Sequence, residues 1–115
     1  MEIKTEDYNI WYDAAAKAVT CQGSLRLGGM EEYTPIVQLL DDVVAEQPPI
    51  LTLNLGGLKF LNSSGINVLS KFVIKVRQKN IQLVVQGSTN IPWQGKSLKN
   101  LQRLMPSLEL EWAGD

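Results

Sequence analysis

Histidine is absent from the 115-residue sequence, and cysteine occurs only once, as Cys21. Without histidine, the chain lacks the side chain that most often transfers protons near neutral pH and that commonly binds zinc. A single cysteine excludes a disulfide within the chain. The sequence therefore argues against an ordinary zinc site and against histidine-based acid–base catalysis.

An excess of charge of one sign is also lacking. Basic residues number 11 and acidic residues 12, which gives a formal net charge of −1. Because the two signs are interspersed, no basic face of the kind that binds nucleic acid is expected. The apolar runs are shorter than the roughly 20 residues of a membrane span, and the charged residues 1–7 do not resemble a signal peptide. We expect a cytoplasmic protein that neither binds nucleic acid nor inserts into a membrane.

Hydrophobic residues make up 44% of the sequence, enough for the core of one compact domain over residues 1–115. Short segments in which apolar residues alternate with polar ones, or follow one another without a break, are typical of strands. They are separated by segments in which apolar residues recur every three to four positions, as in helices. The patterns predict strands at 8–13, 18–25, 50–55, 81–86 and 108–112, and helices before Pro48, after Ser64 and at 97–105. The first helix opens either at Thr34-Pro35 or at Met30-Glu31-Glu32, and Gly56-Gly57 and Gly87 are interpreted as strand ends.

Strands that alternate with helices indicate right-handed crossovers and a largely parallel sheet. The first two strands are close enough in sequence to form an antiparallel hairpin. The predicted fold class is therefore a single α/β domain, with a mixed, mostly parallel sheet of about four to five strands and helices packed on it.

Several side chains have a structural interpretation that is simpler than a functional one. We expect Cys21 to lie in the core and Trp93 to cover it, while Asp41 and Asp42 face solvent. The buried face of the second helix is predicted to comprise Leu69, Phe72, Val73 and Val76. The basic residues Lys96, Lys99 and Arg103 are interpreted as a solvated face.

The most informative segment is Lys59-Phe60-Leu61-Asn62-Ser63-Ser64-Gly65-Ile66, between a strand and the second helix. Free amides and the helix dipole favour negative charge at a helix N-terminus, so a phosphate added to a serine there is tolerated. Serine is equally a favoured N-cap, which contributes about 1 kcal/mol without any further function. Asn62 can also serve as a cap or turn residue. Spacing alone favours the capping interpretation of Ser63 and Ser64 over phosphorylation.

The sequence contains no convincing combination of catalytic residues. No nucleophile–base pair, phosphate-binding glycine loop or metal-ligand cluster is evident, and Gly56-Gly57 and Gly28-Gly29 are interpreted as turn glycines. We therefore expect a protein that is not an enzyme and that needs no cofactor.

The element order, together with Leu53-Asn54-Leu55 and Phe60-Leu61-Asn62-Ser63-Ser64-Gly65, resembles the STAS domain family over nearly the whole chain. This family includes anti-sigma factor antagonists and the cytoplasmic domains of sulfate transporters. Its motif is an apolar strand followed by aspartate, serine, serine or threonine, and glycine. The resemblance implies a regulatory domain for signal transduction and transcription regulation by partner switching, with Ser63 as the phosphorylated residue and Ser64 as the less favoured one.

The resemblance also implies the partners. They are a protein kinase of the histidine-kinase-type ATPase fold, which is also the anti-sigma factor, and possibly a phosphatase. ATP then belongs to the kinase. The implied partner-binding surface comprises Gly57, Asn62, Ser63, Ser64, Gly65, Asn67, Ser70, Lys71, Lys75 and Gln78.

The sequence departs from the family pattern in three places. Asn62 replaces the aspartate, and Gly23-Ser24-Leu25-Arg26 replaces Gly-Glu-Leu-Asp, so acidic groups are lost. The sequence also ends at Asp115, before the family's usual last helix, which would leave apolar surface near Trp112 for a partner. The lost acids favour an alternative function, that of a constitutive STAS subunit of an ABC-type lipid transport complex.

Overall fold

The structure is a computed structural model that describes residues 1–114, in which strands and helices alternate after an initial run of strands. The elements are β1 (Glu2–Lys4), β2 (Tyr8–Asp13), β3 (Ala18–Leu25), α1 (Thr34–Ala45), β4 (Ile50–Leu61), α2 (Ser63–Gln78), β5 (Gln82–Ser88), α3 (Gln94–Leu104) and β6 (Glu109–Ala113).

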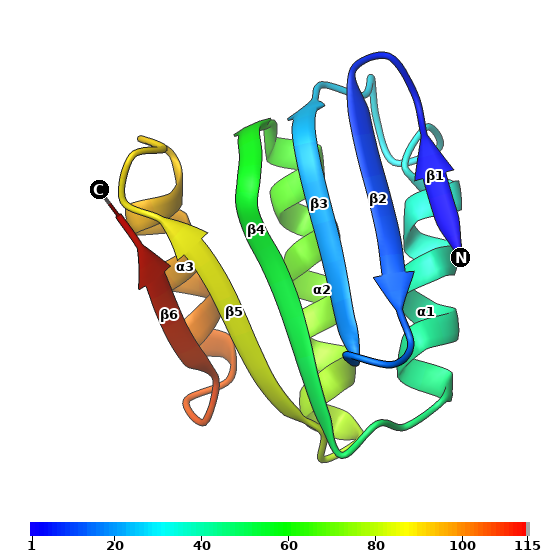
Figure 1. Ribbon diagram of the computed structural model, residues 1–115, viewed down its shortest axis with the longest axis vertical. Helices are drawn as coiled ribbons and strands as arrows, with labels where there is room; N and C mark the ends of the chain where they lie inside the picture. The colour runs from blue at the N-terminus through cyan, green and yellow to red at the C-terminus, as the bar shows by residue number, and fades with distance from the viewer. Residues whose placement is uncertain (115) are drawn as a thin grey trace.

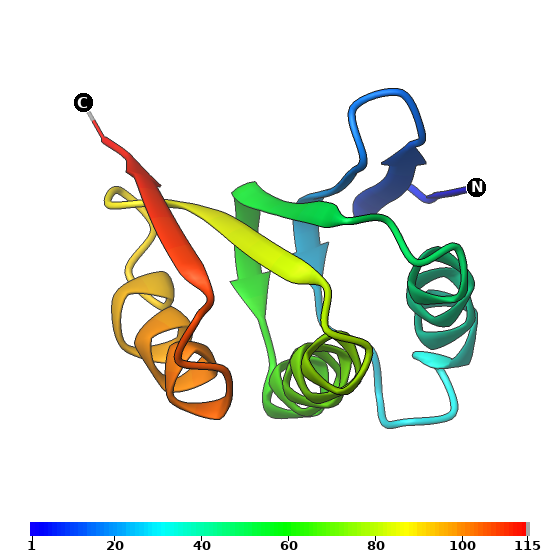
Figure 2. The same cartoon turned by 90° about the horizontal axis from the view of Figure 1, so that it is seen from below.

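The strands lie side by side in their order along the chain, β1-β2-β3-β4-β5-β6, in one mixed sheet (Figure 1). The pairs β1–β2 and β2–β3 are antiparallel, whereas β3–β4, β4–β5 and β5–β6 are parallel. Because each parallel crossover advances in the same direction and is right-handed, all three helices must lie on one face of the sheet. Figure 2 shows this arrangement. The predicted single α/β domain is confirmed.

The core lies between the sheet and its helices. Along β4, Leu51, Leu53 and Leu55 are fully buried toward the helices, whereas Thr52 and Asn54 alternate onto the opposite face and are partly exposed. The buried residues of α2 are Gly65, Val68, Leu69, Phe72, Val73 and Val76, which confirms the predicted face. Cys21 is buried as expected. None of the helices in the described residues is long and apolar enough to span a membrane.

The sheet contains one strand more than the sequence predicted. β1 pairs with β2 through Glu2↔Trp11, Ile3↔Ile10 and Lys4↔Asn9. Three residues are too short a run to show a periodic pattern, so this edge strand was not recognisable from the sequence.

The interpretation of Gly56-Gly57 as a strand end is wrong. β4 continues through both glycines because its pairing with β3 continues through Gly57↔Gln22 and Leu61↔Leu25, with two register shifts on the way. The pairing of β4 with β5 does stop at Asn54↔Gln86. The two strands therefore diverge beyond this point (Figure 1).

A buried glutamine joins the two strands where they diverge. The Nε2 atom of Gln94 donates to the carbonyl oxygens of Leu55 at 2.7 Å and Leu58 at 3.1 Å, and its Oε1 atom accepts from the amide of Ser88 at 2.7 Å. The indole of Trp93 also donates to the Leu58 carbonyl, at 3.0 Å. Gln94 thus bridges β4 and β5 where their backbone hydrogen bonds are missing, and Trp93 packs against the core as expected.

This role of Gln94 corrects two predicted boundaries. α3 begins at Gln94 rather than at residue 97, and β5 passes through Gly87 to Ser88. Gln94 lies in the loop-like local sequence Pro92-Trp93-Gln94-Gly95, and only its tertiary contacts make it the buried first residue of a helix.

The first helix begins at Thr34, with Tyr33 at the N-cap position and Pro35 in the first turn. Thr34 is therefore not the cap, and residues 30–33 form turns rather than helix. The helix ends before Pro48, as predicted. Asn80, which follows the second helix, has the left-handed backbone conformation, with φ = 58°.

Candidate functional site

Asn62 alone separates β4 from α2, and its side chain caps the helix. Its Oδ1 atom accepts a hydrogen bond from the Gly65 amide at 3.0 Å. The interpretation of Ser63 or Ser64 as the N-cap is therefore wrong, since these are the first two residues of α2. Their amides lie in the first turn, where no intrahelical acceptor exists. Capping does not explain why two serines stand here.

The Asn62 side chain also connects three parts of the fold. The Tyr33 hydroxyl donates to Oδ1 at 2.7 Å, and Nδ2 donates to the Leu27 carbonyl at 2.7 Å. Burial raises the pKa of Tyr33, so its hydroxyl remains a donor at neutral pH. The start of α2 is thus held against the segment after β3 and the start of α1. The Tyr33–Asn62 contact was missed, although a buried tyrosine usually needs a partner for its hydroxyl.

This network explains an asparagine at the position of the motif aspartate. A carboxylate can accept from Gly65 and Tyr33, but it cannot donate to the Leu27 carbonyl. It would place one of its oxygens against that carbonyl oxygen instead. The amide is the group that satisfies all three neighbours.

Glycine at position 65 follows from close packing. A Cβ atom there would lie 2.2 Å from Cδ1 of Leu61 and 2.7 Å from the Tyr33 hydroxyl. Gly65 is buried, so its contribution to any partner surface is indirect. Gly57 is half-buried within β4, at a distance along the chain from the start of α2. Residues 57–61 thus belong to a strand, although the predicted partner-binding surface includes Gly57.

The exposed side of α2 brings together several predicted partner-binding residues. Ser63, Asn67 and Lys71 are exposed at intervals of four residues, so they follow one side of the helix. Ser64 and Ser70 are half-buried, and the Ser70 hydroxyl donates back to the Ile66 carbonyl at 2.9 Å. Ser63 is the more accessible of the two candidate phosphorylation sites.

Two exposed apolar residues were not recognised from the sequence. Ile74 on α2 and Phe60 near the end of β4 are each 39% exposed. The Arg26 guanidinium stacks over the Phe60 ring, with 4.5 Å between its carbon and the ring centroid. Exposure of single apolar side chains is common, and their sequence positions alone carried no signal.

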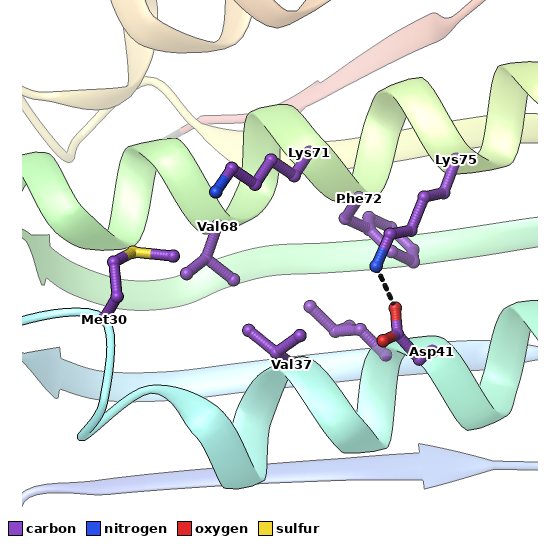
Figure 3. A pocket seen from close by; sticks show the side chains of 8 residues that line it. Met30, Val37, Asp41, Val68, Lys71, Phe72 and Lys75 are labelled. Carbon is purple, nitrogen blue, oxygen red and sulfur yellow. Dashed lines mark hydrogen bonds and ion pairs between the residues drawn. The ribbon is translucent and has the colours of Figure 1, made fainter.

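Lys75, a predicted partner-binding residue, is engaged within the chain. Its Nζ atom lies 2.6 Å from Oδ1 of Asp41 on α1 (Figure 3). Asp41, expected to face solvent, is partly exposed and is also held in this ion pair, because the packing of α1 beside α2 brings the two charges together. Both side chains remain partly exposed, so the pair contributes at most about 1 kcal/mol.

The basic residues of the third helix lie where the sequence placed them. Lys96, Lys99 and Arg103 are exposed on α3. Residues 1–114 contain no group of three or more histidine, cysteine, aspartate or glutamate side chains arranged to hold a metal ion.

Comparison with known proteins identifies relatives of this arrangement. The family model described as STAS domain matches residues 32–95, which include α1, β4 and α2. None of the curated proteins matches the sequence. Among solved structures, SiaC of Pseudomonas aeruginosa is similar, with a TM-score of 0.75 and 15% identity over 100% of this chain and 98% of that chain.

Two further structures have the same fold. One is SiaC in the crystal structure of the diguanylate cyclase SiaD in complex with its activator SiaC from P. aeruginosa, with a TM-score of 0.75, 15% identity and coverage of 100% of this chain and 99% of that chain. The other is apo-SiaC from P. aeruginosa, with a TM-score of 0.69, 13% identity and coverage of 100% and 98%. Identities this low establish the fold alone.

Proposed function

Since the chain belongs to the STAS domain family, we propose that it is a regulatory protein-binding domain of a partner-switching pathway, controlled by phosphorylation of Ser63. One observation carries the proposal. Asn62 caps α2 through its own side chain, and Ser63 is left exposed as the first residue of the helix. Its hydroxyl is accessible to a kinase without loss of the cap.

The chemistry of this position suits a switch. A phosphate adds about −1.5 to −2 charges at pH 7. The domain tolerates this charge because the amides and dipole at the start of α2 face it. A partner packed against Ser63 does not, because an unpaired charge buried at an interface costs several kcal/mol. Phosphorylation would therefore release the partner without unfolding the domain.

Family membership supports the choice of partner class. A cytoplasmic protein kinase of the histidine-kinase-type ATPase fold would bind the exposed side of α2 and supply ATP, and a phosphatase would reverse the reaction. SiaC, which shares the fold, is described as the activator of an enzyme with which it forms a complex. This supports a role in which the domain controls another protein by binding it.

The test starts from the protein purified from its own cells together with its bound partner. After addition of ATP, mass spectrometry should find phosphate on Ser63, and Ser63→Ala should abolish it. Ser64→Ala is the matched control, because Ser64 is the adjacent helical residue and is half-buried. Ser63→Asp should weaken binding of the partner while its unfolding curve stays that of the parent. Absence of phosphate on both serines, with unchanged binding by Ser63→Asp, would reject the switch.

The alternative is a constitutive STAS subunit of an ABC-type lipid transport complex. Asn62 favours it, because a kinase that recognises the family's aspartate would find an amide here. In this case the protein should co-purify with a permease and an ATPase, without phosphate and regardless of added ATP.

A further inference from the structure

A groove of about 210 Å³ lies between α1 and α2, beside the exposed side of α2. Its walls include Val37 of α1 and Val68 and Phe72 of α2. Figure 3 shows Met30 at one end of the groove, near Val68 and Lys71, and the Asp41–Lys75 ion pair toward the other end. The groove is therefore apolar inside, with charges along its rim.

The size of the groove limits what it can hold. Pockets for small-molecule ligands and cofactors usually measure about 300–1,000 Å³, so this one is too small for most of them. It is large enough for a single large apolar side chain of another protein. Met30 is 40% exposed at its edge, and the flexible methionine side chain adapts its shape to an inserted group.

The charged side chains at the rim of the groove indicate which charge the docking segment would carry next to its apolar side chain. α2 carries Lys71, Lys75 and Arg77 and contains no acidic residue. Asp41 already neutralises Lys75. Lys71 is exposed and forms no ion pair with a carboxylate of residues 1–114. One positive charge thus stands free at the Met30 end of the groove.

We infer that this groove is a docking site for a protein segment that inserts one large apolar side chain between α1 and α2 and presents a carboxylate to Lys71. The inference rests on the proposed protein-binding function and adds the kind of segment that is recognised. The Asp41–Lys75 ion pair lies at the end of the groove opposite Met30. Because its two charges compensate each other, this pair neither attracts nor repels a charged group of the segment strongly. The carboxylate of the segment is therefore directed toward Lys71. Lys71 lies two helical turns beyond Ser63, so one partner can cover both.

A displayed library of random twelve-residue peptides, selected on the full-length protein, tests this inference. Selection should enrich peptides with a large apolar residue and an aspartate or glutamate within about four positions of it. Lys71→Glu should weaken the selected peptides by about three- to tenfold, as expected for reversal of a partly exposed charge pair. Selection repeated on Lys71→Glu should enrich lysine or arginine in place of the acid. Lys96→Glu, an equally exposed change on α3, should leave the original peptides unaffected.

Met30→Ala tests the apolar half of the inference without disturbing the core, because Met30 is exposed at the groove edge. It should weaken the selected peptides severalfold. No enrichment, enrichment without an acid, or peptides that bind Met30→Ala and Lys71→Glu as well as the parent would each overturn the inference. The phosphate experiment is independent. Phosphate on Ser63 without such peptides rejects the groove and retains the switch, whereas such peptides without phosphate reject the switch and retain the groove.

Discussion

The hydroxyl of Tyr33 lies 2.7 Å from Oδ1 of Asn62, across 29 positions of sequence, and joins the start of α1 to the cap of α2. The same asparagine reaches the Leu27 carbonyl through its Nδ2 atom. The orientation of the first turn of α2, where Ser63 is exposed, therefore depends on the segment between β3 and α1 and on the start of α1.

Replacement of Asn62 should separate its roles as cap and as donor. Asn62→Ala loses the cap and both other hydrogen bonds, so we expect a loss of about 2–3 kcal/mol in the free energy of unfolding. Asn62→Asp keeps the acceptor for Gly65 but sets an oxygen against the Leu27 carbonyl, and we expect a loss of about 1–2 kcal/mol. Urea unfolding measures both, with Ser64→Ala as a control that should change little. An Asn62→Asp protein as stable as the parent would show that Leu27 does not require the amide.

The Tyr33–Asn62 contact should appear as an energetic coupling. Tyr33→Phe removes only the hydroxyl, and in an Asn62→Ala background that hydroxyl has already lost its 2.7 Å partner. A double-mutant cycle should therefore give a coupling of about 0.5–1.5 kcal/mol. Purely additive losses in urea unfolding would contradict a direct hydrogen bond.

Truncation of the Phe72 side chain should destabilise the protein more than most other core substitutions. It is 2% exposed, at the centre of the buried face of α2. Phe72→Ala should lower the free energy of unfolding by about 3–5 kcal/mol, a large part of the total for a small domain. Phe72→Leu should cost less and keep the fold measurable. Ile74→Ala, a change two residues away at a 39% exposed position, should have a small effect. A normal melting curve for Phe72→Ala would refute the assigned face.

Gln94 should matter through hydrogen bonds rather than through volume. Gln94→Leu keeps an apolar side chain of similar size but leaves the Ser88 amide and the Leu55 carbonyl without their partner. Each unsatisfied buried group costs about 1–3 kcal/mol, so we expect a total loss above about 2 kcal/mol. The Ser88 amide should also exchange its hydrogen faster. Gln78→Leu on the exposed end of α2 is the control, and unchanged protection of Ser88 would argue against the bridge.

Cys21 should make the protein less stable at alkaline pH. Burial raises the pKa of its thiol from the ordinary 9.0 to about 12. Between these two pH values the thiol of the unfolded protein loses its proton, while the thiol of the folded protein keeps it. The free energy of unfolding therefore falls as the pH rises. Because the two states differ by at most one proton, the fall is at most about 1.4 kcal/mol per pH unit. Burial raises the pKa values of Tyr12 and Tyr33 as well, so their titration also lowers the stability as the pH rises. Cys21→Ala should therefore show a shallower, but not flat, decrease in stability across pH 9–12. An identical pH dependence in both proteins would place the thiol in contact with water.

Local patterns in the sequence determined much of this protein. The two hydrophobic periods indicated the α/β class, the strands around the crossovers and the buried face of α2, because side-chain direction repeats every two residues in a strand and every 3.6 in a helix. The Ser63-Ser64 pair was placed at the start of α2 for the same reason, since a strand and a helix meet there. These features depend on residues close together in the chain.

The tertiary structure decided the features that depend on residues far apart. Gly56-Gly57 belongs to a strand because β3 pairs with it, and Gln94 is buried because β4 and β5 diverge beside it. Asn62 caps α2 through a local contact, as the sequence allowed, but an amide became necessary there only when Tyr33 and Leu27 came within 2.7 Å. The α1–α2 groove and the Asp41–Lys75 pair likewise arise from helices that are adjacent in space. A polar or glycine residue has no periodic signature of its own, so its role is set by the group that folding brings to it.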